Sequence, residues 1–111
     1  MQRTVNSVIL VGSLGRDAEQ VQAGSQTVTK FSVATNQRWK DKQSGEWKES
    51  TEWNNVVLWG QENLAQFLTK GKQVYIGGRL QTRSFDKGGE KQYRTEVVAD
   101  QVILLGGGRD S

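Results

Sequence analysis

Hydrophobic side chains recur along the chain in five segments that have β-strand character. In some segments they run together, as in VILVGSL, and in others they alternate with polar residues, as in VTKFSVATN. Alternation is the pattern of a strand with one buried face. Two adjacent glycines inside the fourth segment predict a β-bulge. The predicted strands are residues 8–14, 28–36, 51–59, 73–85 and 92–105.

Residues 61–68 follow a different period and predict a short α-helix between the third and fourth strands. Leu64, Phe67 and Leu68 fall at the i, i+3 and i+4 positions of one helix face, and Lys70 before a glycine is a typical helix end. Five strands in this order predict an all-β OB-fold, a Greek-key barrel with long hairpin loops that binds oligonucleotides or oligosaccharides. An SH3-like barrel is the weaker alternative.

The length of 111 residues fits one domain with a modest core. We expect residues 1–105 to form this domain and residues 106–111 to be a short flexible end. No apolar run approaches the length of a signal-peptide core or the ~18 residues of a membrane span. The sequence therefore predicts a cytoplasmic protein without a membrane partner.

The absence of cysteine and histidine excludes several classes of protein. The chain has no disulfide framework and lacks the usual ligands of zinc, copper and non-haem iron, so no cofactor is expected. It also lacks a thiol nucleophile and an imidazole base. The phosphate-binding pattern GxxxxGK(S/T) fails at Gly71 and Lys72, because Gln66 and Gln73 occupy its first and last positions. We expect a binding protein rather than an enzyme.

The four tryptophans of the chain lie close together in sequence, separated mostly by charged and hydroxyl side chains. Trp53 and Trp59 share one face of the third predicted strand, and Val56 belongs to the opposite face, which is the better core candidate. The two indoles are therefore expected to form an exposed platform about 20 Å long. Trp39 and Trp47 have charged neighbours and no apolar partner within their hairpin.

Basic residues gather between positions 70 and 94, where seven cations and two anions give +5 within a chain whose total charge is +3. Rings near cations suit single-stranded nucleic acid, because bases stack on the rings and phosphates seek the cations. Stacking predicts little sequence preference. A neutral sugar could use the same rings but gains nothing from the cations, and a protein interface rich in aromatic residues and arginine is a further alternative.

Four blocks of the sequence resemble, in order, spacing and residue type, those of the bacterial single-stranded DNA-binding protein (SSB) family. They are VNSVILVGSLGRDAE, TEWNNVVLWG, KGKQVYIGGRLQTRSFD and YRTEVVAD, and they span almost the whole chain. The resemblance implies an OB-fold that binds and protects single-stranded DNA in replication, recombination and repair. It also implies bases stacked on Trp39, Trp53, Trp59 and Phe85 and phosphates held by Arg3, Lys42, Lys72 and Arg83.

The same resemblance implies a homotetramer built as a dimer of dimers. The first strand supports this expectation, because residues 8–11 are all apolar and offer more hydrophobic surface than one barrel face needs. Members of the family usually continue into a flexible tail whose acidic tip recruits replication and repair proteins. We expect such partners only if the native chain extends beyond Ser111, and the glycines from Gly106 onward look like the start of a removed tail.

Several positions depart from the family pattern. Trp59 stands where phenylalanine is frequent, and Phe85 where tryptophan is frequent, so the number of rings is kept. Gly77 replaces a common acidic residue. Trp47 has no standard aromatic counterpart, and its interpretation as an extra platform, a lid over DNA or a subunit contact stays open at this point.

Overall fold

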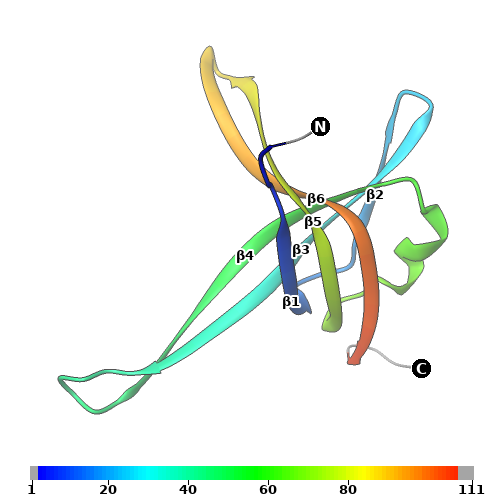
Figure 1. The fold of residues 1–111 in the computed structure, drawn as a ribbon. Helices are drawn as coiled ribbons and strands as arrows, with labels where there is room; N and C mark the ends of the chain where they lie inside the picture. The colour runs from blue at the N-terminus through cyan, green and yellow to red at the C-terminus, as the bar shows by residue number, and fades with distance from the viewer. Residues whose placement is uncertain (1–2, 108–111) are drawn as a thin grey trace.

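The computed structural model describes residues 3–107, with side chains as far as residue 106, and contains six strands and one short helix (Figure 1). The elements follow each other in the order β1 Val8–Leu14, β2 Glu19–Ala23, β3 Gln26–Lys40, β4 Trp47–Trp59, η1 Glu62–Phe67, β5 Lys72–Lys87 and β6 Glu90–Gly107. Residues 1–2 and 108–111, which include most of the expected flexible end, lie outside the described residues.

The strands form a single sheet in the order β1-β5-β6-β4-β3-β2, which closes on itself where β1 pairs with β3. Closure is made by Ser13 opposite Ala34 and Leu14 opposite Val33. β4 and β6 run parallel, and the other pairs are antiparallel. This closed sheet, with its helix between β4 and β5, confirms the predicted OB-fold barrel.

The core lies inside the barrel and is built from alternate residues of the strands. Phe31 and Val33 of β3 belong to the same core cluster as Val56 and Leu58 of β4, and all four are buried as their alternation predicts. The predicted bulge is also present, because the β5–β6 register shifts between Gly77 and Gly78. At Gly78 a Cβ atom would collide with the carbonyl oxygen of Val98, so the close approach of the two strands requires glycine there.

The helix differs from the predicted α-helix because η1 is a 3-10 helix of six residues. Gln61 precedes it in the left-handed conformation with φ 51° and without a side-chain cap, and Leu68 N–H bonds Ala65 O three residues back at 3.0 Å. So short a segment suits the tighter helix. Leu68 is buried and holds η1 against the core, whereas Phe67, predicted on the same face, is 52% exposed.

The strand β2 was not predicted because all five residues of its sequence EQVQA are exposed and carry no burial pattern. β2 and β1 pair with the same edge of β3, at residues 26–30 and 33–34 respectively, so β2 adds a hairpin without enlarging the barrel. The other unpredicted extensions are at the outer ends of β3, β4, β5 and β6, where both faces meet solvent. Alternation cannot reveal strands of this kind.

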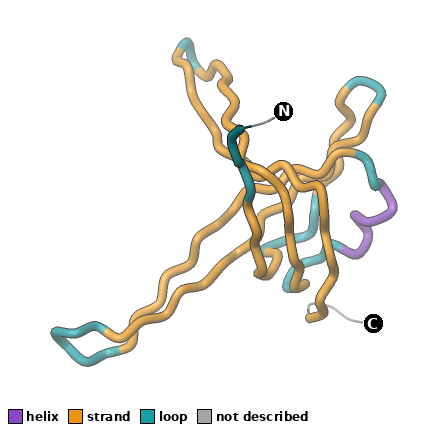
Figure 2. Tube along the Cα trace, in the orientation of Figure 1, coloured by secondary structure: helices purple, strands orange, loops and turns teal. Residues whose placement is uncertain are grey.

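Three hairpins project from the barrel, and the longest is formed by β3 and β4 (Figure 2). We call its outer part, residues 36–51, the arm. Asp41 organises the tip of the arm: Oδ1 accepts a bond from the Gln43 N–H at 3.2 Å and Oδ2 one from the Ser44 hydroxyl at 3.0 Å. Lys48 Nζ lies 3.4 Å from Oδ2. These contacts, led by the Gln43 N–H, hold the pKa of Asp41 below its ordinary value.

Candidate nucleic-acid interface

The outer face of β4 carries three tryptophans at intervals of six residues. Trp47, Trp53 and Trp59 point away from the core, on the strand face opposite that of Val56 and Leu58. Their exposed fractions are 60%, 58% and 47% respectively. The face predicted for Trp53 and Trp59 is therefore the exposed one, as expected. A row of exposed indoles on one strand is a surface on which flat ligands can stack.

Trp53 lies against the backbone of Gly15, in the turn that follows β1. A Cβ atom at Gly15 would collide with Cζ3 and Cη2 of the indole, so only glycine leaves room for the ring in this position. The amide of Gly15 bonds Ser32 O of the neighbouring strand at 3.3 Å, which fixes that backbone. Trp53 is thereby held by a rigid support while more than half of its surface faces solvent.

Trp59 forms one wall of a cavity of about 230 Å³ on the same outer face. Its apolar lining comes from β2, β3, β4 and β6, and its polar groups come from β3 and from the inner part of the β5–β6 hairpin. The residues that line it with Trp59 include Lys30, Val57, Gln81, Arg83, Glu96 and Val98. An indole, an apolar floor and a few polar groups match the general make-up of a site for an aromatic ligand.

A second cavity of about 260 Å³ lies along β4 between Trp53 and Trp59. Asn55 and Val57 form part of its lining on the β4 side. Two carboxylates line it: Glu19, which lies 3.8 Å from Arg16, and Glu96, which is the ion-pair partner of Arg83. Three cations from three elements also line it: Arg16 from the turn after β1, Lys30 from β3 and Arg94 from β6. Sequence analysis missed these three as site residues, because only barrel closure brings them together. Because Arg16 offsets Glu19 and Arg83 offsets Glu96, the excess positive charge between the two stacking surfaces comes from Lys30 and Arg94.

Arg83, a predicted phosphate contact, is engaged with a buried carboxylate. Its Nε bonds Glu96 Oε1 at 2.9 Å and its Nη2 bonds Oε2 at 3.3 Å. The Glu96 side chain is 6% exposed and the Arg83 side chain 43%. The register places Arg94 directly opposite Arg83. Glu96 therefore offsets one of two facing arginines and leaves the other to act on a ligand.

Phe85, the ring predicted on the β5–β6 hairpin, is 36% exposed and lies opposite Gln92. It occupies the same strand face as Gln81 and Arg83, which line the Trp59 cavity. Phe85 thus extends the aromatic surface from that cavity along the hairpin. Tyr93 is 67% exposed, but it belongs to the opposite face of the hairpin and does not continue this surface.

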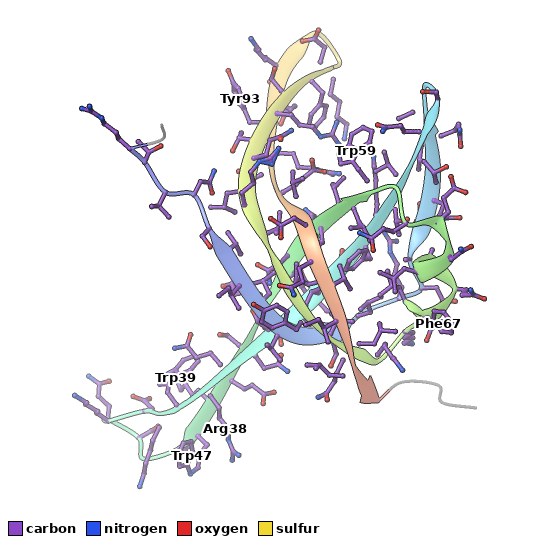
Figure 3. All side chains as sticks on the ribbon, turned by 45° about the vertical axis from the view of Figure 1, so that its right-hand side comes forward. Arg38, Trp39, Trp47, Trp59, Phe67 and Tyr93 are labelled. Carbon is purple, nitrogen blue, oxygen red and sulfur yellow. The ribbon has the colours of Figure 1, made fainter. Side chains whose placement is uncertain are left out.

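Trp39 lies on the opposite face of the arm from Trp47. In the β3–β4 register Trp39 faces Lys48, whereas Trp47 faces Lys40, and the two pairs are successive. In Figure 3 Trp39 lies on one side of the arm, and Arg38 and Trp47 lie on the other. Trp39 is 42% exposed. It lies on the same face of β3 as Phe31 and Val33, which are buried in the core nearer the start of the strand. It is therefore not part of the row formed by Trp53 and Trp59.

The remaining predicted cations are dispersed. Arg3 is exposed in the segment before β1, and Lys42 is exposed at the tip of the arm. Lys72 is partly buried at the start of β5, the opposite end of that strand from Phe85. None of the three lines the two cavities beside Trp53 and Trp59. Among residues 3–107 no group of acidic side chains is placed to hold a metal ion.

Comparison with known proteins identifies the family. A model of the single-strand binding protein family matches residues 5–105. The chain belongs to this family. It is 47% identical over 111 aligned residues to "Single-stranded DNA-binding protein 1" of Chlorobaculum tepidum, an alignment that covers 96% of this chain and 68% of that protein. The resemblance noted in the four sequence blocks is thus confirmed.

Solved structures of SSB proteins share the fold. The Plasmodium falciparum SSB in complex with single-stranded DNA superposes with a TM-score of 0.84 at 29% identity, over 96% of this chain and 99% of that one. A deletion mutant of the single-stranded DNA-binding protein from Thermus aquaticus gives a TM-score of 0.79 at 28% identity, over 95% of this chain and 52% of that one. No helix within residues 3–107 is long and apolar enough to cross a membrane.

Proposed function

We propose that this protein binds and protects single-stranded DNA with little sequence preference, in replication, recombination and repair, and acts by binding rather than catalysis. The observation that carries the proposal is the outer face of β4, where two exposed indoles flank a cavity that Lys30 and Arg94 line in addition to the ion pair Arg16–Glu19 and to Glu96, the partner of Arg83. Family membership and the relative solved with single-stranded DNA support it. We also propose that the protein is cytoplasmic and associates with the nucleoid, where its DNA ligand is found.

The physical basis is stacking combined with charge neutralisation. Each base stacked on an aromatic ring contributes about 1–3 kcal/mol, and this contribution is similar for every base. Each neutralised phosphate releases counterions and adds salt-dependent affinity. Duplex DNA keeps its bases stacked inside the helix, so the indoles have no base face to contact. The site should therefore distinguish single-stranded from duplex DNA and should not distinguish one base sequence from another.

Residue roles follow from these two requirements. We assign base stacking to four rings and phosphate contact to the cations around them, without any cofactor. The stacking residues are Trp39, Trp53, Trp59 and Phe85, and the predicted phosphate contacts are Arg3, Lys42, Lys72 and Arg83. The cavity geometry adds Arg16, Lys30 and Arg94 to the second group. Of the predicted cations, Arg83 has the closest relation to the rings, because it lines the cavity of Trp59.

A homotetramer, arranged as a dimer of dimers, is the assembly we propose. The outer face of β1, β5 and β6 carries exposed apolar side chains: Ile9 is 65% exposed, Val11 57% and Ile103 44%. Val11 faces Tyr75, which in turn faces Ile103, so these side chains form one row across three strands. A patch of this kind is typical of a subunit interface. Several copies would let one DNA strand wrap around the oligomer, because binding to one subunit raises the effective concentration of the strand at the next.

The mass of the oligomer in solution tests the proposed assembly. Ile9→Asp places a charge on the outer face of β1, next to the apolar row, and should lower the oligomer mass measured by light scattering after gel filtration. Phe67→Asp is the matched control, because Phe67 is 52% exposed on η1, away from that row. A tetrameric mass for Ile9→Asp would remove this face from the interface. Binding of replication and repair proteins is proposed only for a native chain that carries an acidic tail.

The test of DNA binding is tryptophan fluorescence titrated with oligo-dT, with a duplex and a neutral oligosaccharide as parallel ligands. The proposal predicts strong quenching by oligo-dT, weakened by salt, and little response to the duplex or the sugar. No response to oligo-dT would contradict it. A salt-independent response to the sugar would instead assign the rings to carbohydrate binding.

A further inference from the structure

Trp47 continues the row of indoles along β4 towards the tip of the arm. It precedes Trp53 by six residues, as Trp53 precedes Trp59, and all three occupy the same strand face. The interval corresponds to about 20 Å of strand. At 60% exposed, Trp47 is more open to solvent than either of the other two. The β3–β4 register is unbroken from Val28 opposite Trp59 to Lys40 opposite Trp47, so one continuous ladder carries the row.

Arg38 is placed to act together with this ring. Its guanidinium carbon lies 4.9 Å from the centroid of the Trp47 ring, a cation–π contact. Arg38 takes part in none of the ion pairs found among residues 3–107. The residue directly opposite Arg38 is Glu49, but the two charged groups do not form an ion pair, so the guanidinium can still attract a phosphate. A ring next to a cation is the pairing that a base and its phosphate require.

The arm gives these side chains a defined position. The Asp41 N–H bonds Glu46 O at 2.8 Å, and the Gly45 N–H bonds Asp41 O at 2.8 Å, which closes the tip just before Trp47. The carboxylate of Asp41 adds its contacts to Gln43, Ser44 and Lys48. Trp47 thus sits at the end of a closed ribbon and not within a loose loop.

Internal packing and subunit contact account less well for this ring. The residue facing Trp47 across the ribbon is Lys40, and no apolar side chain of the arm covers it. Its surroundings include Arg38, Lys40 and Glu49, whereas the outer face of β1, β5 and β6 carries Ile9, Val11 and Ile103. An interface built on hydrophobic burial would not select this position.

We propose that Trp47 and Arg38 form a further contact for single-stranded DNA, with a base stacked on the exposed indole and a phosphate beside the guanidinium. The contact rests on the proposed function and extends the path from Trp59 and Trp53 to the outer end of β4. Trp39, on the opposite face of the arm, serves a different segment of the strand. The arm accordingly engages DNA on both faces.

Affinity for oligo-dT of increasing length tests the extension. Trp47→Ala should weaken binding of long oligonucleotides about fivefold or more, the effect of one lost stack. The shortest oligonucleotide that binds should be unaffected, because Trp53 and Trp59 hold it. Trp47→Phe keeps a ring and is the matched control. Arg38→Gln should reduce the log-log salt slope by roughly 0.7 for one lost phosphate contact.

Variants with a single tryptophan test directly whether Trp47 contacts DNA. A chain with Trp39→Phe, Trp53→Phe and Trp59→Phe keeps Trp47 alone, and its fluorescence should be quenched by saturating long oligo-dT. The matched variant keeps Trp53 alone. Quenching of Trp53 without quenching of Trp47 would overturn this inference and leave the proposed function intact. Trp47 emission that varies with protein concentration, and not with DNA, would make it a subunit contact. Failure of the unmodified chain to bind oligo-dT would overturn the proposed function itself.

Discussion

The guanidinium of Arg83 holds the carboxylate of Glu96 through two hydrogen bonds, of 2.9 and 3.3 Å, at the edge of the proposed DNA path. Glu96 is buried inside the sheet face that carries the two cavities, and Arg83 reaches it from the neighbouring strand. The pair thus has two effects. It satisfies a buried charge, and it reduces the positive charge that Arg83 can offer to a phosphate.

Arg83→Ala should therefore lower stability as well as affinity. The variant leaves a buried carboxylate unpaired, and we expect a loss of about 1–3 kcal/mol in the free energy of unfolding. The value stays below that of a fully buried pair, because Arg83 is partly exposed and water can enter. Urea unfolding measures the loss. Adding Glu96→Gln to Arg83→Ala should restore part of it, and a double variant no more stable than Arg83→Ala would contradict this role.

Arg94→Ala separates phosphate contact from stability. Arg94 faces Arg83 and lines the cavity between Trp53 and Trp59, but it is exposed and is not the partner of Glu96. We expect stability close to that of the unmodified protein and a log-log salt slope shallower by roughly 0.7 per lost phosphate contact. Oligo-dT titrations over a range of salt measure the slope. An unchanged slope would show that Arg94 touches no phosphate.

Gly15→Ala tests the support of Trp53. The added methyl group would occupy the space of the indole, so the ring must move or the turn must shift. Affinity for oligo-dT should fall by up to about 1 kcal/mol, the lower estimate for one stacked base. Gly77→Ala is the matched control, because a Cβ there makes ordinary contacts at 3.6 Å or more. Equal affinities for the two variants would argue against the packing of Trp53 on Gly15.

Acid should loosen the tip of the arm. The lowered pKa of Asp41 means that its charged form is favoured in the folded arm. Its contribution to arm order is therefore present above the pKa of the unfolded chain and is lost as pH falls through the folded value, below about pH 4. The protection factors of the Gln43 and Gly45 amides, measured by NMR hydrogen exchange and referred to the intrinsic exchange rate at each pH, should fall over this range. Asp41→Asn should raise exchange at neutral pH, and protection unaffected by either change would refute the role of the carboxylate.

The strand faces could be predicted because alternation reports burial directly. Val56 and Leu58 fill the core while Trp53 and Trp59 remain exposed, and the paired glycines mark the bulge in β5. The missed elements lack such a signal: β2 is exposed along its length, and in the arm both faces meet solvent. The difference between α-helix and 3-10 helix in η1 depends on hydrogen bonds that the apolar spacing of Leu64 and Leu68 does not specify.

The site was predicted more fully in its rings than in its cations. Rings could be placed by strand face, whereas the relation of Arg83 to Glu96 depends on the β5–β6 register after the bulge. The gathering of Arg16, Lys30 and Arg94 depends on closure of the barrel, which brings three distant segments to one cavity. The contrasting faces of Trp39 and Trp47 depend on a register that the hairpin loop sets.

The central claim is that the outer face of β4 stacks the bases of single-stranded DNA. The most direct measurement is the dissociation constant for oligo-dT, at fixed salt, of the unmodified protein and of a variant carrying Trp53→Ala and Trp59→Ala. With about 1–3 kcal/mol per stack, the loss should reach about 2–6 kcal/mol while the circular dichroism spectrum and the unfolding midpoint remain close to those of the unmodified protein. An unchanged dissociation constant in the folded variant would contradict the claim.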